Sequence, residues 1–267
     1  MTTILYSILV LGILGAIFGA VLAIAAKIFH VEVDPRQEAV RAALAGANCG
    51  GCGYPGCDGY AAAVAAGKAP TNKCVAGGAE TAAKVAEIMG VSAGAEERKI
   101  AFVPCSGCEG HAEKRFNYTG PQDCRAAMLF GGKSNKTCTF ACIGLGNCTR
   151  ACKFDAIHIV DGIAQVDRSK CVGCGACADT CPKSIIKLLP ASQRVEPGCS
   201  NKDKGAKVMK MCDFGCIGCM KCQRECPADA IVVVDNLAVV NNDKCVKCGH
   251  CVDVCPRHII RWFEKAE

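Results

Sequence analysis

The chain opens with a long apolar segment. Residues 4–26 contain no charged side chain, and as a helix they would span about 34 Å against a hydrocarbon core of about 30 Å. A cleaved signal peptide is the alternative, because an Ala-Ile-Ala stretch resembles a cleavage site, but no basic residue precedes the segment. Lys27 and Arg36 follow it. The positive-inside rule therefore predicts a single-pass anchor in the cell membrane, residues 1–28, with the bulk of the chain on the cytoplasmic side.

After the anchor, the pattern predicts two short helices around a glycine-rich loop. Asp34 and Pro35 are typical of an N-cap followed by proline in the first helical turn, and the helix continues over residues 36–44. The loop NCGGCGYPGC comes next, and a second helix follows over residues 59–66. We therefore expect a small helical domain over residues 32–90.

The C-terminal half contains an internal repeat. Residues 138–186 align without gaps with residues 212–260, and 26 of the 49 positions are identical. DAIHIVDGIAQV in the first copy and DAIVVVDNLAVV in the second each predict two strands around a tight turn. The expected fold is α+β, with two tandem domains at residues 138–190 and 191–267. Residues 91–137 are expected to form a connecting segment with extra cysteines.

Composition changes this picture, because 25 of the 267 residues are cysteine. Most of them fall in C-x-x-C-x-x-C runs, which direct thiols into one small volume and suit a metal or cluster better than a disulfide framework. Reduced thiolates require a reducing compartment, in agreement with the cytoplasmic side. The formal net charge of +6 counts cysteine as neutral, whereas a cubane with four thiolates carries about −2 to −3. The basic charge is therefore no argument for nucleic-acid binding, and no basic-aromatic platform accompanies it.

The second repeat copy carries two C-x-x-C-x-x-C-x-x-x-C-P runs. This is the signature of two-cluster bacterial ferredoxins, in which the fourth cysteine of each run ligates the other cluster. The predicted ligands of one [4Fe–4S] cluster are Cys216, Cys219, Cys222 and Cys255. The predicted ligands of the other are Cys245, Cys248, Cys251 and Cys226.

The first repeat copy departs from this signature in its first run, where Leu145 stands at the position of Cys219. Cys138 is expected to supply the missing thiolate. One predicted ligand set is then Cys138, Cys142, Cys148 and Cys181. The other is Cys171, Cys174, Cys177 and Cys152.

The glycine-rich loop predicts a fifth cluster. Glycine permits positive φ and leaves room where a Cβ would meet a group larger than a single ion, although spacing alone also allows zinc. The predicted ligands are Cys49, Cys52, Cys57 and Cys74. A sixth cluster is one hypothesis for the remaining cysteines, and free structural or reactive thiols are the other. Its candidate ligands are Cys105, Cys108 and Cys124, with Cys199 or Cys212.

The order of these features resembles the B subunits of Rnf complexes, the ion-translocating ferredoxin:NAD⁺ oxidoreductases, in their long multi-cluster form. The anchor, the short helix, NCGGCGYPGC, the lone cysteine and the ferredoxin-like runs carry the resemblance, which covers essentially the whole chain. It implies a membrane-anchored polyferredoxin that accepts electrons from reduced soluble ferredoxin. Other subunits with flavin and iron–sulfur groups would receive them, while Na⁺ or H⁺ crosses the membrane. It also implies that the matching cysteines bind [4Fe–4S] clusters.

No sequence motif suggests catalysis in this chain. No G-x-G-x-x-G follows a predicted strand and no P-loop is present, so hydride transfer would belong to another protein of the complex. The alternative is an iron–sulfur enzyme with one incompletely ligated cluster, for which Cys105, Cys108 and Cys124 are the candidate triad. A zinc-stapled binding module is a third hypothesis, and it predicts zinc without sulfide.

Overall fold

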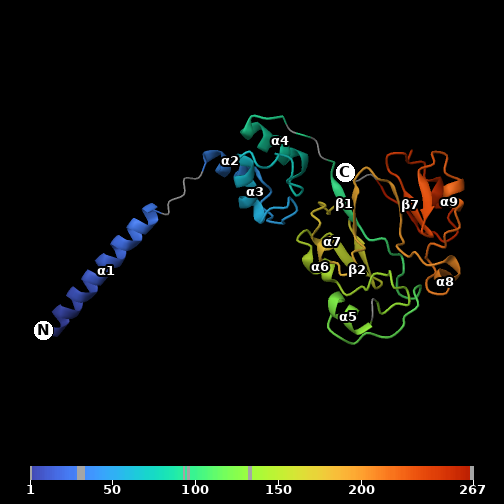
Figure 1. The fold of residues 1–267 in the computed structure, drawn as a ribbon, viewed down its shortest axis with the longest axis horizontal. Helices are drawn as coiled ribbons and strands as arrows, with labels where there is room; N and C mark the ends of the chain where they lie inside the picture. Colours follow the sequence, from blue (N-terminus) through green and yellow to red (C-terminus); the bar gives the residue numbers. More distant parts are fainter. Residues whose placement is uncertain (1, 29–33, 93, 95–96, 132–133, 265–267) are drawn as a thin grey trace.

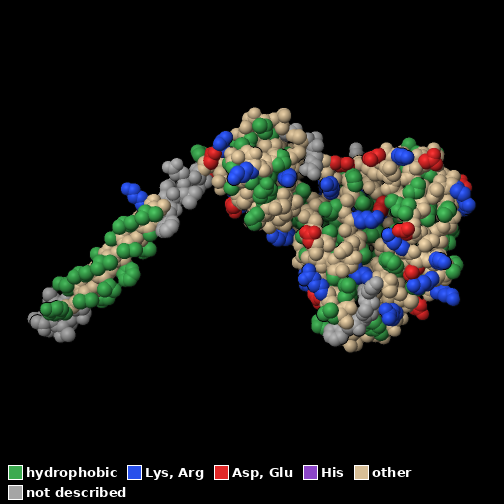
Figure 2. All heavy atoms as spheres, viewed as in Figure 1, with side chains coloured by type: hydrophobic (Ala, Val, Ile, Leu, Met, Phe, Trp, Pro, Cys, Tyr) green, Lys and Arg blue, Asp and Glu red, His purple; other side chains and the backbone are tan. Residues whose placement is uncertain are grey.

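The computed structural model describes residues 2–28, 34–92, 94, 97–131 and 134–264. The expected boundary around residues 29–33 lies outside the described residues. Helix α1 (Thr2–Ile28) begins the chain. Apolar side chains cover it in Figure 2, and its span from Ile8 to Ile28 has a mean hydropathy of 2.8 with none of it buried. By length and composition, α1 can cross a membrane.

The next domain is a bundle of three short helices, α2 (Pro35–Ala43), α3 (Gly56–Ala65) and α4 (Gly78–Met89). Asp34 caps α2 by accepting a hydrogen bond from the backbone amide of Arg36 at 2.8 Å. The three helices meet in a core that includes Val40, Tyr60, Val64 and Val85. The two helices expected around the glycine-rich loop are confirmed, and α4 is an additional helix.

The first ferredoxin-like module is built on a hairpin. Its elements are β1 (Lys99–Phe102), α5 (Cys124–Gly131), α6 (Asn147–Ala151), β2 (Ile157–Val160), β3 (Ile163–Val166), α7 (Ala176–Thr180) and β4 (Lys187–Pro190). Strands β2 and β3 are antiparallel, and Asp161 and Gly162 between them have φ of 48° and 71°. Positive φ at both central residues matches the right-handed twist of the strands, so the predicted hairpin is confirmed.

The second module repeats this plan. Its elements are β5 (Val195–Pro197), α8 (Gly205–Met209), α9 (Lys221–Arg224), β6 (Ile231–Val234), β7 (Leu237–Val240), α10 (His250–Asp253) and β8 (Ile260–Trp262). Strands β6 and β7 form the second hairpin, again with positive φ at Asp235 and Asn236. Figure 1 shows the two modules side by side, with the α2–α4 domain between them and α1.

Each module gains a second strand pair that the sequence pattern did not indicate. Strand β1 pairs with β4, and β5 pairs with β8, both antiparallel. Strand β1 lies in the expected connecting segment, so part of that segment packs into the first module. Residues 111–113 of the same segment also pair with residues 211–213 of the second module, through an antiparallel bridge between Ala112 and Cys212. The segment therefore joins the two modules.

Candidate metal centres

Three groups of four cysteines line separate pockets in the modules, and each group equals a set predicted from spacing. We call each group of four a quartet and number the six quartets from the N-terminal domain to the C-terminal module. Quartet 2 is Cys152, Cys171, Cys174 and Cys177. Quartet 5 is Cys216, Cys219, Cys222 and Cys255. Quartet 6 is Cys226, Cys245, Cys248 and Cys251. In each group one cysteine comes from the other run, which is the crossed arrangement of two-cluster ferredoxins.

Backbone amides donate hydrogen bonds to sulfurs of these quartets. Ala156 N donates to Cys152 Sγ at 3.4 Å, and Ala230 N, the equivalent position in the repeat, donates to Cys226 Sγ at 3.3 Å. Ala101 N in β1 donates to Cys171 Sγ at 3.4 Å. Such N–H groups stabilise negative charge on sulfur and tune the reduction potential of a cluster. The donor set therefore fits an anionic iron–sulfur group.

Burial keeps the free thiols protonated. It raises the pKa of Cys148 and Cys177 to about 12, and the pKa of Cys222 and Cys251 to about 11, with neighbouring cysteines adding to the effect. Metal ligation requires thiolates, so metal binding at these sites must release protons. Isolated thiolates are therefore disfavoured in these pockets.

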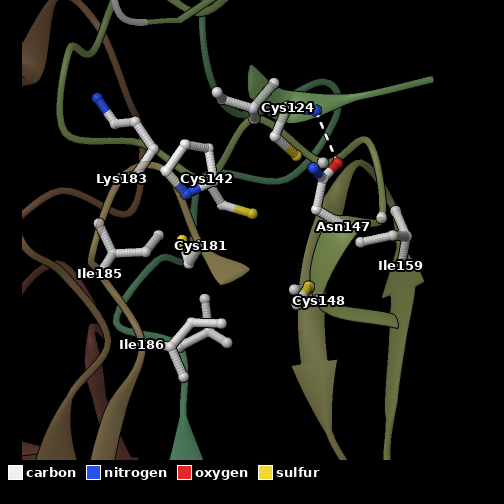
Figure 3. A pocket seen from close by; sticks show the side chains of 15 residues that line it. Cys124, Cys142, Asn147, Cys148, Ile159, Cys181, Lys183, Ile185 and Ile186 are labelled. Carbon is white, nitrogen blue, oxygen red and sulfur yellow. Dashed lines mark hydrogen bonds between the residues drawn. The ribbon is translucent and has the colours of Figure 1, made fainter. Parts of the chain in front are cut away.

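Quartet 3 differs from the predicted set in one ligand. Its pocket is lined by Cys124, Cys142, Cys148 and Cys181, and Figure 3 shows these residues around one space. Cys138, which was predicted to lie here, lines another pocket. The reason is the position of α5, whose first residue is Cys124. This helix fills the gap that Leu145 leaves in the first run.

Asn147 explains how Cys124 reaches this pocket. Its Oδ1 accepts a hydrogen bond from Cys124 N at 2.7 Å, and its Nδ2 donates to Asp123 Oδ2 at 2.9 Å. Asp123 in turn accepts hydrogen bonds at Oδ1 from the amides of Arg125 and Ala126, so it caps α5. Asn147 is therefore a positioning residue that the sequence pattern did not reveal. The leucine at position 145 signalled a missing ligand without showing where its substitute lay.

Quartet 4 combines cysteines that the sequence left in different groups. Its pocket is lined by Cys105, Cys138, Cys199 and Cys212. Cys199 and Cys212 are therefore both present, where the hypothesis of a sixth cluster offered them as alternatives. Cys124 belongs to quartet 3, and Cys108 is absent from the residues that line these pockets. The three cysteines considered for an incompletely ligated cluster therefore do not meet. Cys105 belongs to quartet 4, Cys124 to quartet 3, and Cys108 to neither.

Quartet 1 lies in the helical domain and consists of Cys49, Cys52, Cys57 and Cys74. The last three pack against the core of α2–α4. Asn48 Oδ1 accepts a hydrogen bond from Cys57 N at 2.8 Å and so closes the loop at the start of α3. A Cβ on Gly51 would lie 2.7 Å from Val75 Cγ2. The loop thus approaches the residue next to Cys74, as the prediction of this fourth ligand requires.

The loop of quartet 1 also touches quartet 2. A Cβ on Gly51 would lie 2.9 Å from both Cα and Cβ of Cys174, so only glycine permits this approach. Lys153 Nζ donates to Asn48 O at 2.8 Å. Lys153 replaces the proline of the ferredoxin signature, and its ammonium ties the first module to the helical domain. Quartets 1 and 2 are therefore direct neighbours.

The quartets surround pockets and do not converge on single points. Within the described ranges, no three Cys, His, Asp or Glu side chains lie close enough to hold one metal ion. The pockets of quartets 2 to 6 each enclose 340–370 Å³, including their open mouths. Four cysteine sulfurs line each of these spaces, and four thiolates are the usual ligand set of a [4Fe–4S] cluster.

Three models of known families match the chain. Residues 44–76 match a putative Fe–S cluster family, which covers all four cysteines of quartet 1. Residues 215–260 match a 4Fe–4S dicluster domain, and residues 137–185 and 170–230 match another family of the same description. The matches establish [4Fe–4S] ferredoxin domains.

Two relatives that match nearly the full chain decide the family. The B subunit of the Na⁺-translocating ferredoxin:NAD⁺ oxidoreductase complex of Acetobacterium woodii is 49% identical over 97% of this chain and 78% of its own length. The B subunit of the ion-translocating oxidoreductase complex of Methanosarcina acetivorans is 39% identical over 95% of this chain and 96% of its own. The chain belongs to the Rnf B-subunit family.

A third member shows that the family spans both coupling ions. The B subunit of the proton-translocating ferredoxin:NAD⁺ oxidoreductase complex of Clostridium ljungdahlii is 40% identical over 98% of this chain and 93% of its own length. Relatives named for Na⁺ and for protons thus align with the same residues. As a member of the Rnf B-subunit family with [4Fe–4S] domains, the chain is an electron-transfer iron–sulfur component of an ion-translocating oxidoreductase complex.

Proposed function

We propose that the chain is a membrane-anchored electron relay. In this proposal it accepts electrons from reduced soluble ferredoxin and delivers them to flavin- and iron–sulfur-bearing membrane subunits of a ferredoxin:NAD⁺ oxidoreductase. Quartets 1, 2, 3, 5 and 6 each hold a [4Fe–4S] cluster, which when bound takes up and releases single electrons. Hydride transfer to NAD⁺ and translocation of Na⁺ or H⁺ are assigned to other subunits.

The observation that carries the proposal is the direct contact between quartets 1 and 2. The backbone of Gly51, inside the loop of quartet 1, lies against Cys174 of quartet 2. Quartets 2 and 3 share the first module through their crossed runs, since Cys152 follows Cys148 in sequence but lines the other pocket. The cysteines therefore form a continuous series from the helical domain into the ferredoxin modules. A series of adjacent redox sites is suited to conduction.

Exposure supports a direction for the relay. Cys219 of quartet 5 and Cys248 of quartet 6 are exposed, whereas the other cysteines are buried or half-buried. A soluble electron donor can therefore reach the C-terminal module most readily. Quartet 1 lies in the domain that follows α1. Electrons then enter at the C-terminal module and leave near the membrane.

The proposed location is the cell membrane, with α1 as a single-pass anchor and the modules on the cytoplasmic side. Lys27 lies in the last turn of α1, where the positive-inside rule expects a basic residue on the cytoplasmic side. Removal of residues 1–28 should release an iron-loaded protein from membranes. A truncated protein without iron would show that α1 is needed for folding of the modules.

The decisive experiment mixes the purified full-length chain in detergent with chemically reduced ferredoxin under anaerobic conditions. We expect bleaching of the visible iron–sulfur absorption, and electron paramagnetic resonance signals of reduced [4Fe–4S] clusters. Iron analysis should give at least about 20 atoms per chain, four per cluster. About 12 iron atoms would contradict the two ferredoxin modules. Zinc without sulfide would support the binding-module hypothesis, and failure to accept electrons would refute the relay.

A further inference from the structure

The pocket of quartet 4 lies between the two ferredoxin-like modules and is built from two copies of one feature. Cys105 follows β1 and Cys199 follows β5, and each of these strands pairs with the last strand of its own module. Cys138 and Cys212 occupy the same position of the sequence repeat. Each module thus contributes one cysteine after its added strand and one before its first cysteine run. The pocket is therefore lined by two cysteines from each module, at equivalent places in the two modules.

Two hydrogen bonds to the sulfurs are also equivalent in the two modules. Cys142 N donates to Cys105 Sγ and Cys216 N donates to Cys199 Sγ, both at 3.4 Å, and the two donors are equivalent in the repeat. Asn201, with 2% of its surface exposed, donates from Nδ2 to Cys138 Sγ at 3.2 Å. These donors stabilise thiolate charge. They match the N–H groups that surround the sulfurs of quartets 2 and 6.

A buried cation beside the pocket fits an anionic occupant. Lys136 is 2% exposed, and its Nζ donates to Gly107 O at 2.8 Å and Gly162 O at 2.9 Å. Gly107 lines the pocket, and a Cβ there would lie 3.4 Å from Cys212 Sγ. Both hydrogen-bond partners of the ammonium are neutral carbonyls, and a buried charge is costly unless an opposite charge lies near. The Glu109 carboxylate interacts electrostatically with Lys136, and an anionic group with four thiolates beside Gly107 would add a second opposite charge.

The pocket has the size of its neighbours. It encloses about 340 Å³, equal to the pockets of quartets 2 and 5. Its other lining residues include Pro104, Phe140 and Phe214, so apolar side chains shield the sulfurs as they do in the pockets of the other quartets.

We propose that Cys105, Cys138, Cys199 and Cys212 hold a sixth [4Fe–4S] cluster that bridges the two ferredoxin-like modules. The bridging position follows from the two amide donors, because Cys142 belongs to quartet 3 and Cys216 to quartet 5. One N–H···S contact thus joins quartet 4 to each module. In the transfer step, one cluster is oxidised by one electron and its neighbour is reduced by one, with no bond broken. This bridging role rests on the proposed relay, whereas the binding site does not.

The binding site is tested by counting iron, sulfide and zinc in the full-length chain. Wild type should contain about 24 iron atoms, and Cys105→Ala and Cys199→Ala should each lose about four. The matched control is Cys108→Ala, three residues from Cys105 in the same loop, which should lose none. Unchanged iron in both test variants, or zinc bound by these four cysteines without sulfide, would overturn the site. Should both variants fail to fold, a wild-type count of about 20 would overturn it.

The bridge is tested by rapid freezing after mixing with reduced ferredoxin. In wild type, the reduced-cluster signals of both modules should rise together. In Cys199→Ala, quartets 5 and 6 should be reduced at the wild-type rate, and quartets 1 to 3 at least about tenfold more slowly. Equal rates in both modules would refute the bridge and leave the iron count intact. A wild type that accepts no electrons would instead refute the relay and leave the sixth site standing.

Discussion

Replacement of Asn147 by leucine should selectively weaken quartet 3. Asn147 is 7% exposed and holds the segment that carries Cys124. Its Oδ1 accepts from Cys124 N at 2.7 Å, and its Nδ2 donates to Asp123 Oδ2 at 2.9 Å. Leucine has a similar volume but makes neither bond. The capping bonds from Asp123 to α5 would remain, so we expect α5 to form and to dock less often.

The magnitude follows from the two bonds that join Asn147 to the segment of Cys124. A third bond, from Arg150 Nη2 to Asn147 Oδ1 at 2.8 Å, lies within α6 and does not hold that segment. A neutral hydrogen bond contributes about 0.5–1.5 kcal/mol net, and one to a carboxylate about 1.5–3 kcal/mol. Together they stabilise the docked segment by about 2–4.5 kcal/mol. The population in which Cys124 reaches the pocket should then fall roughly 30- to 1,600-fold relative to the undocked segment. A bound cluster holds Cys124 in place and opposes this loss. The effect should therefore appear as faster loss of the cluster from quartet 3.

The assay is the rate of iron release to a chelator from anaerobically purified protein. In Asn147→Leu, about four iron atoms, one cluster's content, should leave in a new fast phase. The control is Thr149→Val on the same helix, because Thr149 Oγ1 donates to Gly146 O at 2.7 Å and does not touch Cys124. If both variants released iron alike, the assignment of Cys124 to quartet 3 would be wrong. If loss of Cys138, and not of Cys124, removed the cluster of quartet 3, the ligand set predicted from the sequence would be supported instead.

Three further predictions follow. Cys255→Ser should remove the cluster of quartet 5 and spare quartet 6; loss of quartet 6 alone, seen by electron paramagnetic resonance, would contradict the crossed ligation. Gly51→Val should slow the reduction of the quartet 1 cluster that remains bound, measured by stopped flow, because its Cβ would lie 2.9 Å from Cys174 Cα; an unchanged rate would argue against the direct contact. Burial raises the pKa of Cys199 to about 12, above an unfolded value of about 8.5, so the unfolded state loses its proton first as pH rises. The metal-free fold should therefore be less stable to urea at about pH 10 than at about pH 7, and a flat profile would refute this coupling.

The local spacing of cysteines determined much of this protein. A C-x-x-C-x-x-C run directs its own three thiols to one volume whatever surrounds it, and the proline-terminated runs imply crossed fourth ligands. The hairpins follow from alternating apolar residues around Asp-Gly and Asp-Asn turns. The uncharged segment of residues 4–26 is apolar enough to predict a membrane helix by itself. In each case the determining contacts lie within a few residues or within one repeated pattern.

Only the tertiary structure decided which distant cysteines meet. Cys124 and Cys138 were both available to replace the ligand missing at Leu145, and Asn147 selects Cys124 through a contact 23 residues away in sequence. Cys105 and Cys199 meet where the loops after β1 and β5 come together, with Ser106 Oγ donating to Gly198 O at 3.0 Å. Such pairings depend on the packing of whole modules and leave no periodic trace in a short window of sequence. The cysteine runs are therefore determined by local sequence, whereas the grouping of distant cysteines is determined by how the modules pack together.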